Sequence, residues 1–146
     1  MKNKIIIFEG CDKSGKSTLI SSFNSLTQYN YWVLDRGFIS SLVYDELFHR
    51  NNKKYFEEIL EKMNQEFDIR IIYCYASDEI IQERLTNSCE TLSPEISDIK
   101  RVKKLFEDNI IHYHLQNIKI DTSESIENCL NKIIKFIEGK SYDNSL

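Results

Sequence analysis

The sequence predicts an α/β fold, and three observations lead to this prediction. Short apolar stretches rich in Ile, Val and Tyr alternate with segments whose apolar residues repeat every three to four positions. The first three apolar stretches are almost continuously apolar, which is typical of strands buried on both faces of a parallel sheet. The chain has 146 residues, close to the usual size of one domain. We therefore expect a single domain over residues 1–146, in which strands and helices alternate.

Each expected element has a recognisable stretch of sequence. The apolar, β-prone stretches predict four strands, at residues 5–9, 31–35, 69–76 and 118–122. Helical periodicity of apolar residues predicts five helices, at residues 19–26, 55–67, 80–85, 99–110 and 126–137. The sequence DTSES precedes the last helix and is rich in residues that cap helix N-termini.

Two polar segments are expected to lie outside these elements. Residues 86–98 contain the single proline of the chain, Pro94, and predict a lid loop. The segment 139–146 follows the last helix and is expected to be a frayed tail.

Composition narrows the class of protein. The N-terminal apolar run is only four residues long, from Ile5 to Phe8, and no run approaches the roughly 20 residues of a membrane span, so we expect no signal peptide and no membrane partner. The four cysteines have no CxxC spacing, which favours a reducing cytoplasm and argues against a zinc site. A net charge of -4 gives no general attraction to nucleic acid.

The stretch FEGCDKSGKSTL contains a phosphate-binding motif. Gly10, Gly15, Lys16 and Ser17 satisfy G-x-x-x-x-G-K-S/T between an expected strand and an expected helix. The glycines let backbone N–H groups converge on an anion, the helix N-terminus adds a positive dipole, and the lysine reaches the outer phosphates. The motif therefore predicts ATP or a similar triphosphate as ligand, with Mg²⁺ on the Ser17 hydroxyl. The alternative is a chance match in a glycine turn.

An acidic and a basic residue end the second expected strand. Asp35 follows four apolar residues, an arrangement that puts a carboxylate beside the metal of a phosphate-loop protein; alternatively, it only caps the next turn. Arg36 comes next and can grip a phosphate with two hydrogen bonds, which suggests a second anion in front of ATP. The alternative for Arg36 is a surface arginine paired with a nearby carboxylate.

At these residues the chain resembles the thymidylate kinase family of phosphate-loop nucleoside monophosphate kinases. FEGCDKSGKST is similar to the family's FEGxDxxGKST, and DRGFISSLVY resembles DRYxxSxxAY, although Gly37 and Val43 depart from it. The resemblance extends over most of the chain. It implies a three-layer P-loop kinase core and a role in nucleotide biosynthesis. The implied activity is transfer of the γ-phosphoryl of ATP to a thymidylate-like (deoxy)nucleoside monophosphate.

The resemblance also implies roles for individual residues. The expected catalytic residues are Lys16, Asp35, Arg36 and, as a candidate for charge stabilisation, Lys13, although Lys13 is equally well explained as a solvated loop lysine. The residues expected to bind ATP and its metal are Gly10, Asp12, Ser14, Gly15, Lys16, Ser17 and Thr18, with Ser17 and Asp35 on Mg²⁺. The residues expected to bind the acceptor are Asp12, Arg36, Phe38, Ser40 and Tyr44.

Departures from the family are also informative. In the family a strand and a helix separate the two motifs, but here only residues 18–34 lie between them. The sheet should therefore have four strands in the order 2-1-3-4, and the acceptor pocket should be more open. Residues 37–50 would be its main remaining wall, with Phe38, Tyr44 and Phe48 as candidates for stacking. The lid is poor in arginine, and Arg84 is explained slightly better as a surface residue.

Two other functions remain open. A more open pocket could admit a modified nucleotide, or a base or end within DNA, and KRVKK (100–104) would then contact phosphates. The acidic net charge disfavours such a nucleic-acid partner. The chain could instead be a catalytically weak nucleotide-binding regulator, although a regulator has no evident need of Arg36. A homodimer is left open.

Overall fold

A four-stranded parallel sheet organises the protein. The computed structural model describes residues 2–88 and 94–139. Its strands are β1 (Asn3–Glu9), β2 (Trp32–Asp35), β3 (Phe67–Tyr75) and β4 (Gln116–Asp121). They lie in the order β2-β1-β3-β4 with every pair parallel, which confirms the expected sheet. Phe8 is in register with Asp35 of β2 and with Ile72 of β3. Because the strands are parallel, their carboxyl ends point to the same end of the sheet.

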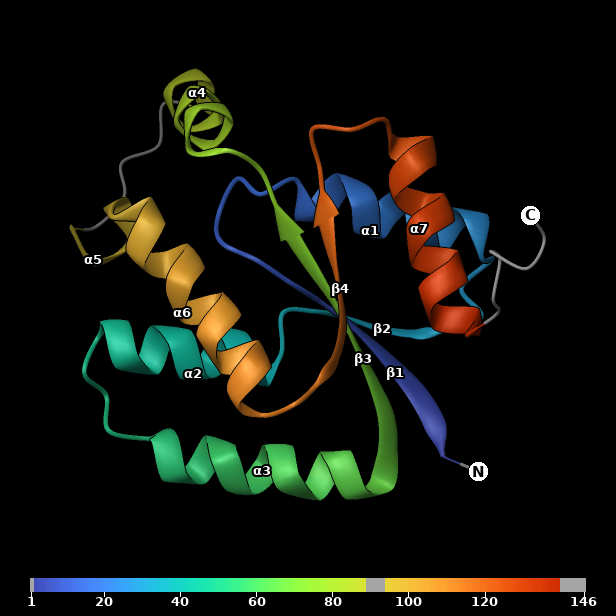
Figure 1. The fold of residues 1–146 in the computed structure, drawn as a ribbon, viewed down its shortest axis with the longest axis horizontal. Helices are drawn as coiled ribbons and strands as arrows, with labels where there is room; N and C mark the ends of the chain where they lie inside the picture. Colours follow the sequence, from blue (N-terminus) through green and yellow to red (C-terminus); the bar gives the residue numbers. More distant parts are fainter. Residues whose placement is uncertain (1, 89–93, 140–146) are drawn as a thin grey trace.

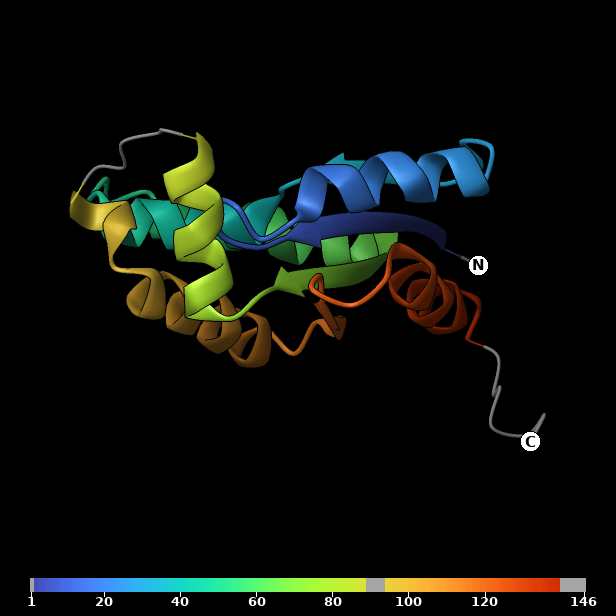
Figure 2. The ribbon, with the colours of Figure 1, turned by 90° about the horizontal axis from the view of Figure 1, so that it is seen from above.

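Helices cover both faces of this sheet. They are α1 (Lys16–Leu26), α2 (Phe38–Leu47), α3 (Lys53–Glu66), α4 (Asp78–Ser88), α5 (Pro94–Ser97), α6 (Ile99–His112) and α7 (Ile126–Glu138). Figure 1 views the sheet along its edge, with α1 and α7 on one side and α2, α3 and α6 on the other. Figure 2 shows α4 beyond the carboxyl end of β3.

Strand β1 carries the packing of both layers because successive side chains of a strand point to opposite faces. Ile5 and Ile7 pack in the cluster that contains residues of α2 and α6, whereas Ile6 and Phe8 pack in the cluster that contains residues of α1 and α7. All four are at most 1% exposed. The continuous apolar run in the sequence is therefore explained by burial on both faces, as expected.

The same expectation is wrong for β2. This strand lies at the edge of the sheet, and Trp32 is 56% exposed. The apolar residues of β2 therefore belong to a strand that has one unpaired edge and is only partly covered by α1. Composition alone did not separate these two situations.

Three further features differ from the sequence-based expectations. Helix α2 was not expected, although Ile39, Leu42, Val43 and Leu47 are buried at helical spacing. The segment 86–98 is only partly a loop, because 86–88 belong to α4 and 94–97 form α5, while 89–93 lie outside the described residues. The helix expected over 55–67 ends at Glu66, because β3 begins with no intervening loop.

The C-terminal expectations are partly tested. Ser125 caps α7 by accepting a hydrogen bond from the Asn128 N–H, which confirms the capping role of DTSES. Gly139 ends this helix with a φ of 66°, and residues 140–146 lie outside the described residues. Across 2–88 and 94–139, every helix is too short or too polar to cross a bilayer.

Candidate active site

The loop between β1 and α1 has the backbone that a phosphate cradle needs. Gly10 has a φ of 149° and Gly15 a φ of 89°, values that side chains rarely permit. A Cβ atom at Gly10 would lie 2.5 Å from the carbonyl oxygen of Cys74, so the loop rests directly on β3. At Gly15 a Cβ would lie 2.7 Å from the Oγ1 atom of Thr122, which follows β4. Two neighbouring strands therefore fix the shape of the loop.

Helix α1 begins at this loop without a side-chain cap. Gly15 is its N-cap residue, and no side chain in the described chain accepts hydrogen bonds from its first amides. Uncapped N–H groups and the positive end of the helix dipole favour an anion at this position. Lys16 is only 8% exposed, and its Nζ lies 3.1 Å from Oδ1 of Asp35.

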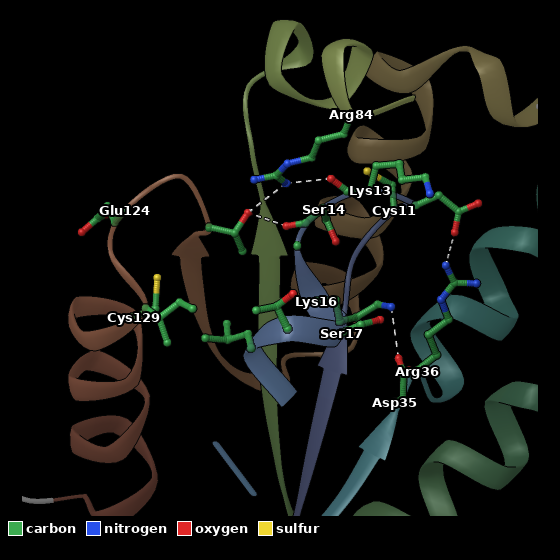
Figure 3. A pocket seen from close by; sticks show the side chains of 16 residues that line it. Cys11, Lys13, Ser14, Lys16, Ser17, Asp35, Arg36, Arg84, Glu124 and Cys129 are labelled. Atoms are coloured by element: carbon green, nitrogen blue, oxygen red, sulfur yellow. Dashed lines mark hydrogen bonds and ion pairs between the residues drawn. The ribbon is translucent and has the colours of Figure 1, made fainter. Parts of the chain in front are cut away.

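A cavity of about 820 Å³ opens in front of the loop. Figure 3 shows Lys16, Ser17 and Asp35 together on one side of this cavity, with Arg84 on the opposite side of the loop. The cavity brings together nine residues expected from the sequence: Asp12, Lys13, Ser14, Gly15, Lys16, Ser17, Thr18, Asp35 and Arg36. Gly10 does not line the cavity; it allows the backbone of the loop to pack closely on β3.

Asp12 and Arg36 form an ion pair at one end of the cavity. The Arg36 NH2 group donates a hydrogen bond to Oδ1 of Asp12. Arg36 has a φ of 69°, an unusual value for a residue with a side chain. Its guanidinium also lies 5.5 Å from the ring centre of Tyr44, within the range of a cation–π contact. Burial raises the pKa of the Tyr44 hydroxyl to about 12, so this group stays neutral.

The remaining expected acceptor residues do not line this cavity. Phe38 and Tyr44 are half-buried and pack against the core between the sheet and α2. Tyr44 stacks on Phe48 with ring centres 6.5 Å apart. Ser40 is 4% exposed, and its hydroxyl donates to Oε1 of Glu9. Tyr44 contacts a residue of the cavity through the cation–π contact with Arg36.

Arg84 and Thr122 complete the site, although the sequence slightly favoured a surface position for Arg84 and carried only a weak signal for Thr122. Arg84 NH1 donates to the carbonyl oxygen of Lys13 at 2.7 Å, and the Thr122 hydroxyl donates to the carbonyl oxygen of Ser14. Both residues line the cavity. The signal for Thr122 is its position directly after β4, because ligands of open α/β sheets bind at the carboxyl ends of strands. The cavity is also lined by Cys11, Leu19, Glu124, Ile126 and Cys129.

The residues that could hold Mg²⁺ are a hydroxyl and a carboxylate. Ser17 and Asp35 both line the cavity, and the Asp35 carboxylate is 55% exposed. Across the described residues there is no cluster of three or more His, Cys, Asp or Glu side chains suited to a metal ion. Mg²⁺ is commonly held by one or two protein oxygens together with substrate phosphates and water. The donor set therefore fits Mg²⁺ that arrives with a nucleotide.

The described chain has the fold of phosphate-loop nucleotide kinases. The YorR protein of Bacillus subtilis, solved with phosphorylated GDP, is similar over 97% of this chain and 98% of its own, at 20% identity and a TM-score of 0.67. A deoxyadenosine kinase of M. mycoides, solved with dCMP and dCDP, is similar over 93% of this chain and 100% of its own, at 13% identity and a TM-score of 0.64. The same enzyme with dATP has a TM-score of 0.61 at 13% identity, over 92% of this chain and 99% of its own. No protein-family model and no curated protein sequence matches the chain.

Proposed function

We propose that this protein is an ATP-dependent phosphotransferase whose acceptor is a (deoxy)nucleoside monophosphate, with a thymidylate-like nucleotide as the first candidate. One observation carries the proposal: the cavity in front of the loop between β1 and α1 is also lined by Arg36, which pairs with Asp12 of that loop. Binding of ATP alone does not require Arg36 beside the Asp35 carboxylate. A second anion in front of the triphosphate would use it.

Each charged group has a role in this reaction. Lys16 and the amides at the start of α1 would bind the outer phosphates of ATP, and Arg36 would bind the acceptor phosphate after leaving Asp12. Asp12 would then be free to accept a hydrogen bond from the acceptor sugar. Lys13 and Arg84 lie at the rim of the phosphate loop, where added positive charge stabilises the transferring group.

The transfer itself needs little covalent help from the protein. An acceptor oxygen forms a bond to the γ-phosphorus of ATP, while the bond from that phosphorus to the β,γ-bridging oxygen breaks and leaves ADP with the electron pair. Mg²⁺, when bound near Ser17 and Asp35, would neutralise charge on the phosphates. The protein contributes alignment of the two anions and exclusion of water. Segment 86–98 is our candidate for the lid.

A screen for phosphoryl transfer tests the proposal. The protein is incubated with ATP and Mg²⁺ and with each nucleoside monophosphate, each free nucleoside or short DNA, and products are identified by mass. A nucleoside diphosphate that appears together with ADP is the expected result. ATP binding without transfer to any acceptor would favour the regulator instead.

Transfer to DNA alone would favour the other alternative, but the basic cluster offers it little support. Lys103 donates hydrogen bonds to the Ala76 carbonyl oxygen and to Asp78, and Lys104 pairs with Asp108. Two of the four cations of KRVKK are therefore already paired with groups of the protein itself. We therefore favour a mononucleotide acceptor.

A further inference from the structure

Glu9 is a buried carboxyl group that lies behind the site and does not line the cavity. It ends β1, is 0% exposed, and reaches the start of α2. Its Oε2 accepts hydrogen bonds from the backbone N–H groups of Gly37 at 3.2 Å, Ile39 at 3.1 Å and Ser40 at 3.3 Å. Its Oε1 accepts a 2.5 Å hydrogen bond from the Ser40 hydroxyl. A strand residue thus caps a helix whose own N-cap residue, Gly37, has no side chain to do so.

The residues that Glu9 holds are continuous with Arg36. The Arg36 N–H donates to the carbonyl oxygen of Phe8 at 2.9 Å, and the next N–H, that of Gly37, donates to Glu9. Arg36 is therefore fixed from both sides by two successive residues of β1. A residue with a side chain keeps a positive φ only when its surroundings hold it there, because this conformation costs about 1 kcal/mol or more. That backbone conformation directs the guanidinium toward Asp12.

We infer that Glu9 is a positioning residue for acceptor binding: it anchors the start of α2 and so holds the Arg36 guanidinium at the acceptor end of the cavity. The part of this inference that concerns the acceptor rests on the proposed function. The part that concerns Arg36 does not. Glu9 is buried and does not line the cavity, so its loss should act on the acceptor through Arg36.

The chain offers a matched control in Asp45. This carboxylate is 5% exposed, lies on α2, and accepts a 2.9 Å hydrogen bond from the Asn52 N–H at the connection to α3. Asp45 and Glu9 are thus both buried acids that accept backbone hydrogen bonds near α2. They differ in that only Glu9 holds the backbone next to Arg36. A purely structural role for Glu9 predicts similar consequences for the two sites.

The test combines nuclear magnetic resonance with kinetics. The Nη2–H signal of Arg36, whose nitrogen donates to Asp12, is assigned by its loss in Arg36→Lys and is recorded in the wild type, Glu9→Ala, Glu9→Gln and Asp45→Asn. We expect Glu9→Ala to move this signal to the position of an unpaired arginine and to raise the KM for the acceptor at least tenfold, with the Kd for ATP within twofold. Glu9→Gln keeps an acceptor oxygen for the α2 amides and should preserve both properties. Asp45→Asn should change neither.

The outcomes separate this inference from the proposed function. An unchanged Arg36 signal in folded Glu9→Ala would overturn the positioning role. If Glu9→Ala does not fold, Glu9→Leu fills the space with an apolar side chain that accepts no hydrogen bond, and the same results are expected of it. A moved Arg36 signal in a protein that transfers phosphate to no acceptor would support the positioning role and refute the kinase. Where transfer occurs, adding Glu9→Ala to Arg36→Ala should cause no further loss.

Discussion

At the scale of single residues, the site contains two pairs of opposite charges. Lys16 faces Asp35, and Arg36 faces Asp12. Each pair joins a residue of the phosphate loop to one of the two residues that end and follow β2. Binding of two anions would exchange these partners, since each phosphate offers the cations a stronger, multiply charged acceptor.

Replacement of Lys16 is the direct test of the phosphate loop. Lys16→Ala should abolish ATP binding or turnover, because it removes the charge that meets the outer phosphates. Isothermal titration with ATP measures this. Lys104→Ala, at a lysine that is 75% exposed and paired with Asp108, is the control and should bind ATP normally. Normal turnover in a folded Lys16→Ala protein would contradict the assignment of the loop.

Replacement of Arg36 separates the two ligands. Arg36→Ala should weaken acceptor binding by about 2–4 kcal/mol, as expected for loss of a charge-assisted pair, and should leave ATP affinity nearly unchanged. Binding of each ligand is measured separately by titration. Equal losses for both ligands would instead put Arg36 on ATP or in the support of the fold.

Glu9 should make stability depend on pH. Burial raises the pKa of its carboxyl from 4.5 to about 7, so between these values the folded protein holds a proton that the unfolded chain has released. Stability should therefore fall as pH rises, by up to about 3 kcal/mol between pH 5 and 8. The Ser40 hydroxyl can donate to or accept from Oε1, and so it suits both protonation states.

Urea unfolding of the wild type and Glu9→Gln across this pH range measures the effect. Glu9→Gln has no proton to lose and should flatten the dependence. The carboxyl groups whose pKa values are lowered, Asp68 by its hydrogen bond with Arg70 and Asp121 by that with Ser123, change stability only at more acidic pH. An equally steep fall in Glu9→Gln would show that another group is responsible.

At the scale of elements, the site depends on how two loops rest against neighbouring strands. The phosphate loop lies on Cys74 of β3 and beside Thr122 after β4, and the start of α2 lies on Glu9 of β1. These contacts are made by backbone atoms, the Thr122 side chain and the buried Glu9 carboxyl group. Small changes in volume should therefore be felt in ligand binding as well as in stability.

Gly10 tests the contact between the phosphate loop and β3. In Gly10→Ala the new Cβ would lie 2.5 Å from the Cys74 carbonyl oxygen, at a φ of 149°. We expect a loss of about 2 kcal/mol or more in the free energy of unfolding, together with weaker ATP binding. Urea unfolding and ATP titration measure the two effects.

Gly139 is the matched control for this experiment. A Cβ there would meet nothing within 4 Å, although φ is 66°. Gly139→Ala should therefore cost only about 1 kcal/mol and leave ATP binding unchanged. If Gly10→Ala binds ATP as tightly as Gly139→Ala, the loop does not need its close contact with β3.

At the scale of the whole molecule, the four-stranded sheet puts the proposed acceptor site beside its edge strand, β2. Asp35 and Arg36 end and follow β2, the edge strand, and α2 follows at once. In the family that the sequence resembles, a further strand and helix wall the base pocket. Here α2 is the nearest wall, and its Phe38 and Tyr44 are partly used in the core.

Because α2 offers only a limited wall for the proposed base pocket, discrimination among acceptor bases should be weak. Base selectivity depends on contacts that reject the wrong base, and few are available beside an edge strand. We expect kcat/KM values for the nucleoside monophosphates within about tenfold of one another. Initial rates over a range of acceptor concentrations give these values. A preference for dTMP of a hundredfold or more would contradict the open pocket.

The sequence by itself determined the parts of this protein that depend on residues close together along the chain. The spacing of Gly10, Gly15 and Lys16 predicted the phosphate loop, and the position of Asp35 and Arg36 after an apolar stretch predicted that they act beside it; all of these except Gly10 line the same cavity. The apolar stretches predicted the four strands, and the resemblance to the thymidylate kinase family, together with the short distance between the two motifs, implied their order.

The tertiary structure alone decided the contacts between distant segments. Arg84 reaches Lys13 across 71 residues, Thr122 reaches Ser14 across 108, and Glu9 meets Ser40 across 31. A buried Glu at a strand end and a Ser on a helix carry no mark of their partners in the sequence. Their roles follow from which strand lies beneath which loop, and that is fixed by packing of the apolar residues of the entire sheet. For the same reason the exposed edge of β2 could not be distinguished from a buried strand by composition.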